Sequence, residues 1–335
     1  MGGRLLCRYR HNYGAYKMSE LAKNEFGEKW AAIEVKDAFL QHGTRFESFY
    51  CAFCDIPVSP VACYGDEFVK APHFAKLKSD HADLCPYGKA GLVAYGINRK
   101  STSATYKFEV DLPERLVPIR AARAGTTPKA IKPSPNYPSD DEIKTRVKDS
   151  AGNLEIANQY TTSLLRTLAA ARRTALSQLY KLPEAKKLAD DAKALNNFVF
   201  GELAKAPLKL YEEKTNYKNA FHGIGKKPWN GRFIYFGDAK ASQSPTGFTL
   251  TAENGPPNEP PLTIRMPVSV HVKCDISHPV NLMERKTNEC LLECIATDAK
   301  VYWFAYGALV LNEARDGYEL RVELPEHIYV STKKP

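Results

Sequence analysis

Hydrophobic residues recur at helical spacing in the middle of the chain. Between residues 164 and 179 they fall three or four positions apart, which places them on one face of an amphipathic helix. Ser139 can cap a helix with an acidic first turn, and Pro183 ends the apolar stripe. We therefore predict a helical segment over residues 139–225. Three arginines lie mostly off the stripe and either pack against a neighbouring domain or contact phosphates: Arg166, Arg172 and Arg173.

Beyond residue 225 the hydrophobic pattern changes to alternation. Residues 318–324 alternate Tyr, Leu, Val and Leu with Glu, Arg and Glu, and the turn residues before them predict a β-hairpin. The run "ECLLECIATDAKVYWFAYG" is interpreted as another apolar strand region, with Cys290 and Cys294 as small buried residues. Residues 226–335 are therefore predicted to form an all-β domain, a small closed barrel or a sandwich.

A proline-rich, basic stretch precedes the helical segment. Residues 96–138 carry eight Lys or Arg against three acidic residues. Such a stretch buries little surface, so we predict a linker. It is either a mobile basic arm that touches phosphates or a plain solvated tether.

The charge of the whole chain narrows the choice of partner. The 335 residues, enough for about two domains, carry a formal net charge of +9 with a pI near 9.0. This balance indicates either a solvated basic surface or a polyanionic partner, most often nucleic acid.

The sequence also favours a cytoplasmic protein. No window approaches the roughly 20 apolar residues of a membrane helix, and the start "MGGRLLCRYR" shows no secretory signal. Four of the 8 cysteines lie between positions 51 and 85. In a reducing compartment, clustered thiols indicate metal binding or catalysis rather than disulfides.

Four side chains within residues 49–88 have the spacing of a structural zinc site. Cys51 and Cys54 form a CxxC pair, and His81 and Cys85 form a second pair with three intervening residues. We predict that they bind Zn²⁺ as a closed, structural Cys3His site in a zinc-finger-like domain spanning residues 30–95. His73 competes with His81 as the fourth ligand.

The order of these residues resembles the N-terminal zinc-finger-like domain of the competence protein CoiA-like family. Cys51 and Cys54 match its CxxC, His73-Phe74-Ala75 matches its HFxH box, and Cys85 matches its closing cysteine. Lys76 stands where the family usually has a second histidine, and His81 is interpreted as the displaced ligand. The resemblance covers residues 45–90 only. It implies association with nucleic acid, because the family's finger precedes a nuclease-like domain linked to DNA uptake and similar fingers occur in mobile-element proteins.

The C-terminal region is similar to oligonucleotide-binding barrels, which stack bases on aromatic rings and hold phosphates with cations. The residues predicted to bind nucleic acid from the outer face are Tyr235, Lys240, Arg265, Lys273 and Trp303. The alternative is that the aromatic residues belong to the core and the cations are solvated.

The fold class is thus predicted to be α+β and multi-domain: a finger, a basic linker, a helical segment and an all-β domain. The predicted function is that of a zinc-containing protein that binds single-stranded DNA or RNA.

Two other functions are open. One is a CoiA-like, Mg²⁺-dependent nuclease, which needs an acid and a D/E-x-K tripeptide on adjacent strand positions to hold Mg²⁺ and orient water. Candidates are Glu34-Val-Lys36, Asp238-Ala-Lys240 and Asp298-Ala-Lys300, although Asp191-Ala-Lys193 has the same pattern inside a predicted helix. The other is a non-catalytic subunit of a larger phage-defence or mobile-element complex, whose β domain contacts protein.

Overall fold

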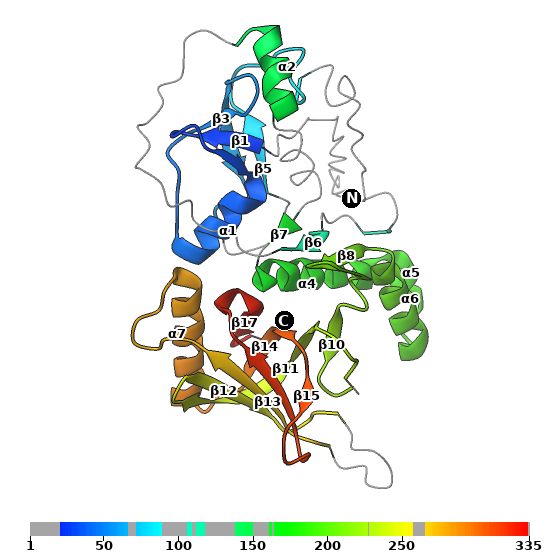
Figure 1. Cartoon of the computed structure of the whole chain (residues 1–335). Helices are drawn as coiled ribbons and strands as arrows, with labels where there is room; N and C mark the ends of the chain where they lie inside the picture. Colours follow the sequence, from blue (N-terminus) through cyan, green and yellow to red (C-terminus); the bar gives the residue numbers. More distant parts are fainter. Residues whose placement is uncertain are drawn as a thin grey trace, which may run out of the picture.

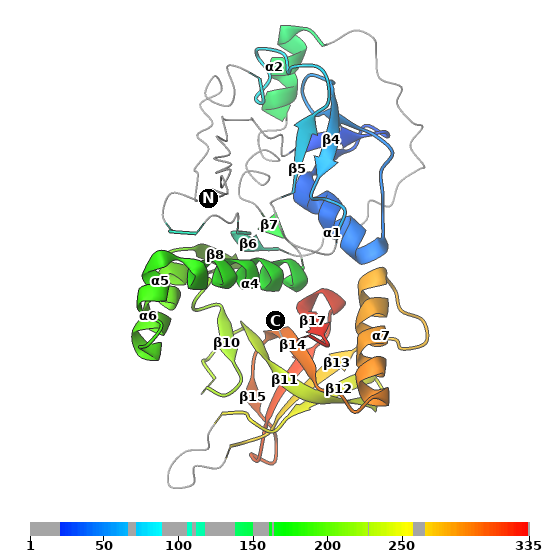
Figure 2. The same ribbon diagram turned by 180° about the vertical axis from the view of Figure 1, so that it is seen from behind.

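The computed structural model describes residues 21–65, 72–88, 106–108, 112–117, 138–149, 161–162, 164–226, 228–256 and 265–333. Most of the predicted linker therefore lies outside the described residues. Within them, strands form three sheets, and α4 lies across the middle of the molecule between the finger and the C-terminal sheet (Figures 1 and 2). None of the described helices has the length and hydrophobicity that a membrane span requires.

The finger is built on an antiparallel sheet with the order β2-β1-β3-β4-β5. Its elements are β1 (Leu21–Asn24), β2 (Lys29–Ala31), α1 (Ala32–His42), β3 (Phe49–Cys51), β4 (Pro57–Val61) and β5 (His73–Lys76). Strand β1, which lies between β2 and β3, precedes the predicted boundary at residue 30. Helix α2 (Asp140–Asp149), which we expected in the helical segment, instead packs Ile143 and Val147 into the finger core.

The middle of the chain confirms the predicted amphipathic helix. Helix α4 spans Leu165–Lys181 and buries its apolar stripe, and Pro183 begins the next helix. The neighbouring elements are β6 (Arg115–Leu116), β7 (Thr161–Thr162), α5 (Pro183–Lys187), α6 (Ala192–Ala204), β8 (Pro207–Leu210) and β9 (Glu213–Asn216). The four strands among them form a sheet in the order β7-β6-β8-β9.

The C-terminal region is an open, mixed sheet with a helix, and the prediction of an all-β barrel is wrong. Its elements are β10 (Phe221–Gly223), β11 (Phe233–Ser244), β12 (Gly247–Ala252), β13 (Val268–Lys273), α7 (Leu282–Ala296), β14 (Val301–Gly307), β15 (Val310–Leu311), β16 (Tyr318–Val322), the 3-10 helix η3 (Pro325–His327) and β17 (Ile328–Ser331). The strand order is β15-β16-β13-β12-β11-β14-β17, with β10 paired to β11, and the ladder does not close. The predicted hairpin is confirmed as the antiparallel pair β15 and β16.

Helix α7 occupies much of the run that we interpreted as a strand. It buries Met283, Thr287, Leu291 and Cys294, which are three or four positions apart, and Asn281 caps its N-terminus through Glu284 N–H. The interpretation failed because the alternating residues of β14 follow only a few positions later and share the same apolar run.

Aromatic rings on β11, β14 and β17 face helix α4. The rings of Phe236, Phe304 and Tyr329 stack across the three strands. The buried guanidinium of Arg172 lies 4.7 Å from the ring centroid of Phe221 and 4.9 Å from that of Phe236. Burial lowers the pKa of Arg172 to about 10. Arg172 therefore packs against the sheet and is not a surface contact for phosphate.

The finger touches the C-terminal region through helices α1 and α7, and in both views one end of α1 lies next to one end of α7 (Figures 1 and 2). Leu40 of α1, Met283 of α7 and Leu164 form a small apolar cluster at this contact. Gly43 ends α1 in the left-handed conformation, with φ 70°, and its N–H donates to Phe39 O. The glycine thus turns the chain away where α7 approaches.

Candidate metal centre

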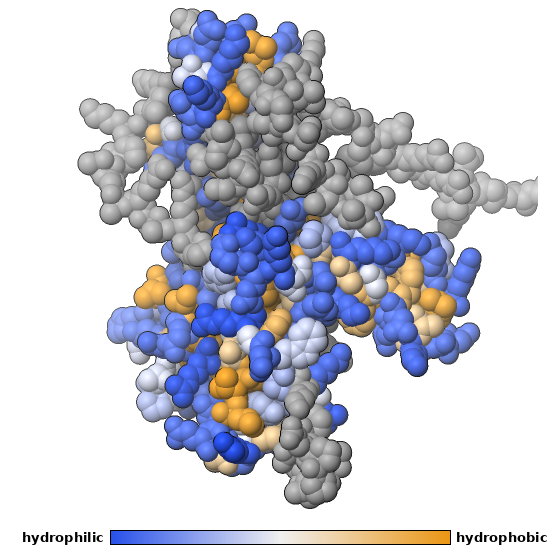
Figure 3. Space-filling model, turned by 45° about the vertical axis from the view of Figure 1, so that its right-hand side comes forward, coloured by the Kyte–Doolittle hydropathy of each residue, from blue (hydrophilic) through white to orange (hydrophobic). Residues whose placement is uncertain are grey.

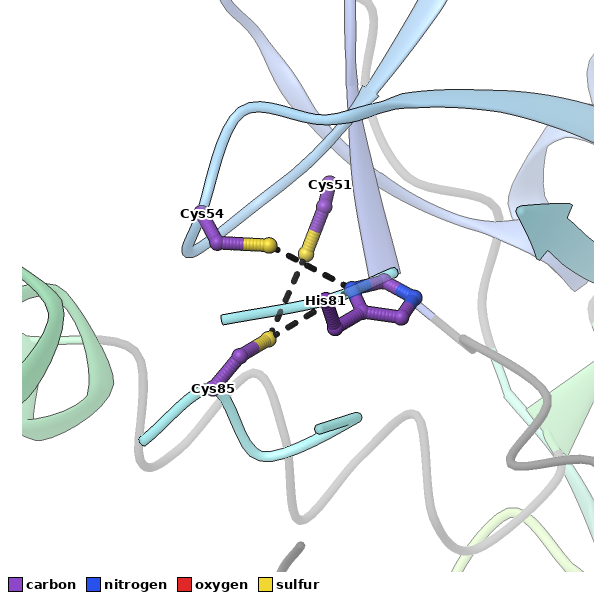
Figure 4. A group of neighbouring side chains, drawn as sticks. All are labelled: Cys51, Cys54, His81 and Cys85. Carbon is purple, nitrogen blue, oxygen red and sulfur yellow. Dashed lines mark hydrogen bonds between the residues drawn. The ribbon is translucent and has the colours of Figure 1, made fainter. Parts of the chain in front are cut away.

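Four predicted ligands meet in the finger. Cys51 ends β3, Cys54 lies in the turn that follows, and His81 and Cys85 come from the segment after β5 (Figure 4). Their ligand atoms all lie within 4.8 Å of one another. Cys51 Sγ is 3.6 Å from Cys85 Sγ, and His81 Nδ1 is 3.3 Å from Cys54 Sγ and 3.6 Å from Cys85 Sγ. This group could hold a metal ion.

Local backbone turns aim the donors at one point. Cys51 N–H donates to Ile56 O and Asp55 N–H donates to Cys51 O, which closes the turn that carries Cys54. Asp55 adopts the left-handed conformation, with φ 58°, that such a tight reversal requires. In the second loop Cys85 N–H donates to Ala82 O, and Gly88 N–H donates to Cys85 O.

The donors are shielded from solvent. The three cysteines are fully buried, and His81 is 9% exposed. The ring of Tyr87 packs against both His81 and Phe53, and its hydroxyl accepts a hydrogen bond from Leu21 N–H. The site is therefore closed by the protein itself, as in structural metal sites.

Three thiols at this separation affect one another's ionisation. Burial raises the pKa of Cys51, and a hydrogen bond with Cys51 raises the pKa of Cys85. Hydrogen bonds with Cys51 and Cys85 lower the pKa of Cys54. The protein alone thus favours a single thiolate, whereas a divalent cation stabilises several thiolates at once.

The two remaining cysteine and histidine candidates lie elsewhere. His73 is on β5 and is not among the clustered donors, so His81 takes the place that the sequence left open. Cys63 is buried and its thiol donates to Ala32 O and Val61 O. Burial raises the pKa of Cys63 to about 12, which keeps it a neutral packing residue.

A residue that the sequence analysis missed supports the CxxC turn. Arg146 of α2 donates through Nη1 to Phe53 O at 3.1 Å and to Asp55 Oδ2 at 2.6 Å. Lys23 of β1 also pairs with Asp55. Helix α2, distant in sequence, thereby fixes the loop between Cys51 and Cys54. Nothing in its sequence marks this role, because an arginine in the last turn of a helix is common.

The residues predicted to bind nucleic acid are separated by the fold. Tyr235 and Trp303 are 1% and 0% exposed, so their predicted outward orientation is wrong. They belong to the core between the sheet and α7. Lys240 pairs with Asp298 at 2.8 Å, and Lys273 pairs with Glu323 at 3.4 Å.

Arg265, the fifth predicted residue, is exposed and lies at the loop that joins β10 to β11. Its Nη1 donates to Gly225 O at 3.2 Å and to Gly255 O at 3.3 Å. Ile224 of the same loop packs into the core with Trp303. The loop therefore helps to cover the face on which we expected Trp303 to be exposed.

The candidate nuclease tripeptides have structural partners. Lys240 pairs with Asp298, and Lys300 pairs with Asp238 at 2.9 Å, so the two Asp-Ala-Lys sequences bridge each other across β11 and the start of β14. Glu34 Oε2 accepts from Ala31 N–H at the start of α1. Among the described residues, no further group of three His, Cys, Asp or Glu has metal-binding geometry.

Trp229 is the aromatic residue that the sequence analysis overlooked. It is 52% exposed, in the loop that joins β10 to β11. The local sequence "GKKPWNGR" could have predicted this exposure. Its proline, glycine and asparagine indicate a loop, and they interrupt the alternation that would bury a tryptophan in a strand.

Comparison with known proteins identified no relative of this chain. No protein-family model, curated protein or solved structure matches the chain.

Proposed function

We propose that the finger binds one Zn²⁺ ion through Cys51, Cys54, His81 and Cys85, and that the protein binds nucleic acid. The observation that carries the metal assignment is the separation of the donors. Tetrahedral zinc with Zn–S of about 2.3 Å and Zn–N of about 2.0 Å implies about 3.8 Å between two sulfurs and about 3.5 Å between sulfur and nitrogen. The observed separations of 3.6 Å between the Cys51 and Cys85 sulfurs, and of 3.3 and 3.6 Å between His81 Nδ1 and the sulfurs of Cys54 and Cys85, fit these values.

The proposed zinc has a structural role. Four protein donors complete a tetrahedron, so no position is left for water or substrate. The ion would connect the β3–β4 turn to the segment after β5. Cys51 and Cys85, one from each of these segments, are 34 residues apart in the sequence. Binding of structural zinc contributes on the order of 10 kcal/mol in small fingers. We therefore assign the ion to folding and not to chemistry.

The proposed nucleic-acid partner is supported by charge. A net charge of +9 attracts a phosphate polymer, and cations that contact phosphates release condensed counterions. The resemblance of the finger to the CoiA-like family points to the same partner class. The reciprocal pairing of Asp238 and Asp298 with lysines offers no support for the nuclease alternative.

The test is a binding assay with the zinc-loaded full chain. Single-stranded DNA, single-stranded RNA and duplexes of each are titrated at several salt concentrations between about 50 and 200 mM, with and without Mg²⁺. We expect affinity for at least one of these polymers to fall steeply and linearly with the logarithm of the salt concentration. Absence of binding to any of them overturns the proposed partner and favours the protein-complex alternative.

The same assay separates binding from cleavage. Mg²⁺-dependent degradation that is lost in Asp238→Ala or Asp298→Ala would establish the nuclease instead. We expect intact polymer in every reaction, because Asp238 and Asp298 are each paired with a lysine.

A further inference from the structure

Trp229 is held in a fixed position although its side chain is half exposed. Its ring centroid lies 4.6 Å from that of His222 and 5.8 Å from that of Phe233, in edge-to-face contacts. His222 is itself fixed, because its Nε2 lies 2.7 Å from Asn219 O and its ring is buried. The indole is therefore supported from below by two rings while much of its surface stays open to solvent.

Two exposed cations, Lys226 and Arg265, are attached to the loop that carries Trp229. Lys226 is exposed three residues before Trp229 in the β10–β11 loop, and its N–H donates to Gly223 O at 3.2 Å. Arg265 lies at the same loop through its bond to Gly225 O. Within the described part of the chain, neither Lys226 nor Arg265 forms an ion pair with a carboxylate. By contrast, Lys240 and Lys273 on the sheet are neutralised by Asp298 and Glu323.

The visible face of the molecule is mostly hydrophilic, with separate small hydrophobic areas (Figure 3). The exposed large hydrophobic side chains come from several different elements, and Trp229 is the tryptophan among them. A half-exposed indole with exposed cations on the same loop is an arrangement that suits an unpaired base and its flanking phosphates.

We propose that Trp229 is a base-stacking platform for single-stranded nucleic acid, with Lys226 and Arg265 contacting the adjacent phosphates. This inference rests on the proposed function and names the surface that performs it. Duplex nucleic acid is a poorer ligand, because its bases are already stacked on one another and present no free face to the indole.

The experiment measures binding of a single-stranded oligonucleotide of about 15 nucleotides to the full chain and to Trp229→Ala and Trp229→Phe. Stacking on one aromatic ring corresponds to about 10-fold to 100-fold in affinity by alanine substitution. We expect a weakening of this size for Trp229→Ala, a smaller loss for Trp229→Phe, and little change with duplex. Tryptophan fluorescence of the unmodified chain is expected to be quenched on binding, and the quenched component is expected to be missing in Trp229→Phe.

Lysine variants provide the matched control. Lys226→Ala is expected to weaken binding and to reduce the salt slope by about 0.7 for one lost phosphate contact on a single strand. Lys240→Ala removes the same charge from a position already paired with Asp298 and is expected to leave both unchanged. If Lys226→Ala and Lys240→Ala change the affinity and the salt slope equally, binding depends on the total charge of the protein. That result would contradict the proposed role of the surface around Trp229.

The failures of the two proposals are distinguishable. If the unmodified chain binds single strands and Trp229→Ala binds equally well, the platform is wrong and the proposed function stands. If the unmodified chain binds no nucleic acid, both are wrong. Equal competition by polyglutamate for the same fluorescence change would also overturn the inference, because it would identify an acidic protein segment as the occupant. The thermal unfolding midpoints of Trp229→Phe and the unmodified chain are also compared. Equal midpoints exclude a folding defect as the cause of weaker binding.

Discussion

Cys54 and His81 illustrate how much a pair of side chains can establish by position. They are 27 residues apart in the chain, yet Sγ and Nδ1 are separated by 3.3 Å. Their types and spacing made both of them candidate ligands in the sequence, because structural zinc ligands usually come in close pairs from two turns. The choice of His81 over His73 needed the structure, since both histidines have the right chemistry and a suitable distance along the chain.

Cysteine substitutions separate ligands from packing residues. Cys54→Ser or Cys85→Ser removes a thiolate donor, and we expect purified protein to lose its stoichiometric zinc and the finger to unfold. Cys63→Ala is the control, because Cys63 is buried outside the cluster. It is expected to retain zinc and to lose only modest stability. Elemental analysis of the three variants measures the difference; zinc retained by both serine variants would contradict the assignment.

His327 should make stability depend on pH. Burial, with a smaller contribution from the charge of Arg232, lowers the pKa of His327 from its usual 6.5 to about 4, and the ring contacts the hydroxyl of Tyr211. Below pH 6.5 the unfolded chain therefore binds a proton before the folded chain does. The contribution of His327 to the free energy of unfolding is complete above pH 6.5 and is lost as the pH falls to about 4.

The measurement is urea denaturation of the unmodified chain and His327→Gln at neutral and acidic pH. After allowance for solvent screening, we expect the variant to lose roughly 1–2 kcal/mol less than the unmodified chain over this window. His278→Gln, at an exposed histidine, serves as the control. Identical pH profiles for all three proteins would show that His327 is not held neutral by the fold.

Helix α2 belongs to the finger, although the chain reaches it only after the proline-rich stretch. Arg146→Ala removes the hydrogen bonds to Phe53 O and Asp55, and we expect a loss of about 1–2 kcal/mol in the free energy of unfolding together with faster release of zinc to a chelator. Lys144→Ala on the same helix loses an exposed pair with Asp141 and should change stability by less than about 0.5 kcal/mol. If the two variants release zinc at the same rate, α2 does not hold the CxxC turn.

The strand β11 passes close to the loop that precedes it, and Gly237 permits this approach. A Cβ at Gly237 would lie 2.6 Å from Ile224 Cδ1 and 2.8 Å from Ile224 Cγ1. Gly237→Ala is therefore expected to lose about 1–3 kcal/mol by overpacking. Ile224→Val in the same chain should recover part of this loss.

A glycine in open space is the control for this substitution. A Cβ at Gly201 of α6 would meet nothing within 4 Å. Gly201→Ala should stabilise the chain by about 0.5–1 kcal/mol, because alanine favours the helix. Thermal and urea unfolding of the three variants measures both effects; a neutral Gly237→Ala would mean that the loop packs less closely than described.

Secondary structure was predictable from sequence where one periodicity stood alone. The stripe that includes Leu165, Leu168 and Leu179 has no competing pattern, and α4 follows it. Residues 282–307 combine helical spacing up to Cys294 with alternation from Val301, and the strand pattern concealed α7. Tyr235 and Trp303 were misplaced because alternation distinguishes two faces of a strand but does not say which face another element covers.

At the scale of the whole molecule, the finger and the C-terminal region are parts of one arrangement. Helix α4 packs on the C-terminal sheet, and α1 and α7 meet through Leu40 and Met283. Sequence separation and composition placed the finger, the helices and the sheet in order along the chain. The contacts among them are non-local, so no window of the sequence contains the information that α2 returns to the finger.

The proposed zinc and the proposed nucleic-acid surface lie on different parts of this arrangement. The metal would organise the finger, and Trp229 lies in the loop that joins β10 to β11. Removing the metal with a chelator should therefore unfold the finger core while the fluorescence of buried Trp303 changes little. Complete loss of tertiary structure in a single step would instead indicate that the two parts fold as one cooperative unit.

The central claim is that three thiolates and one imidazole bind a zinc ion in the front part of this chain. The most direct measurement is zinc X-ray absorption spectroscopy on protein purified without added metal, together with elemental analysis. The account predicts stoichiometric zinc with three sulfur neighbours at about 2.3 Å and one nitrogen neighbour at about 2.0 Å. Protein that is folded and contains no zinc, or zinc coordinated mainly by oxygen, would contradict it.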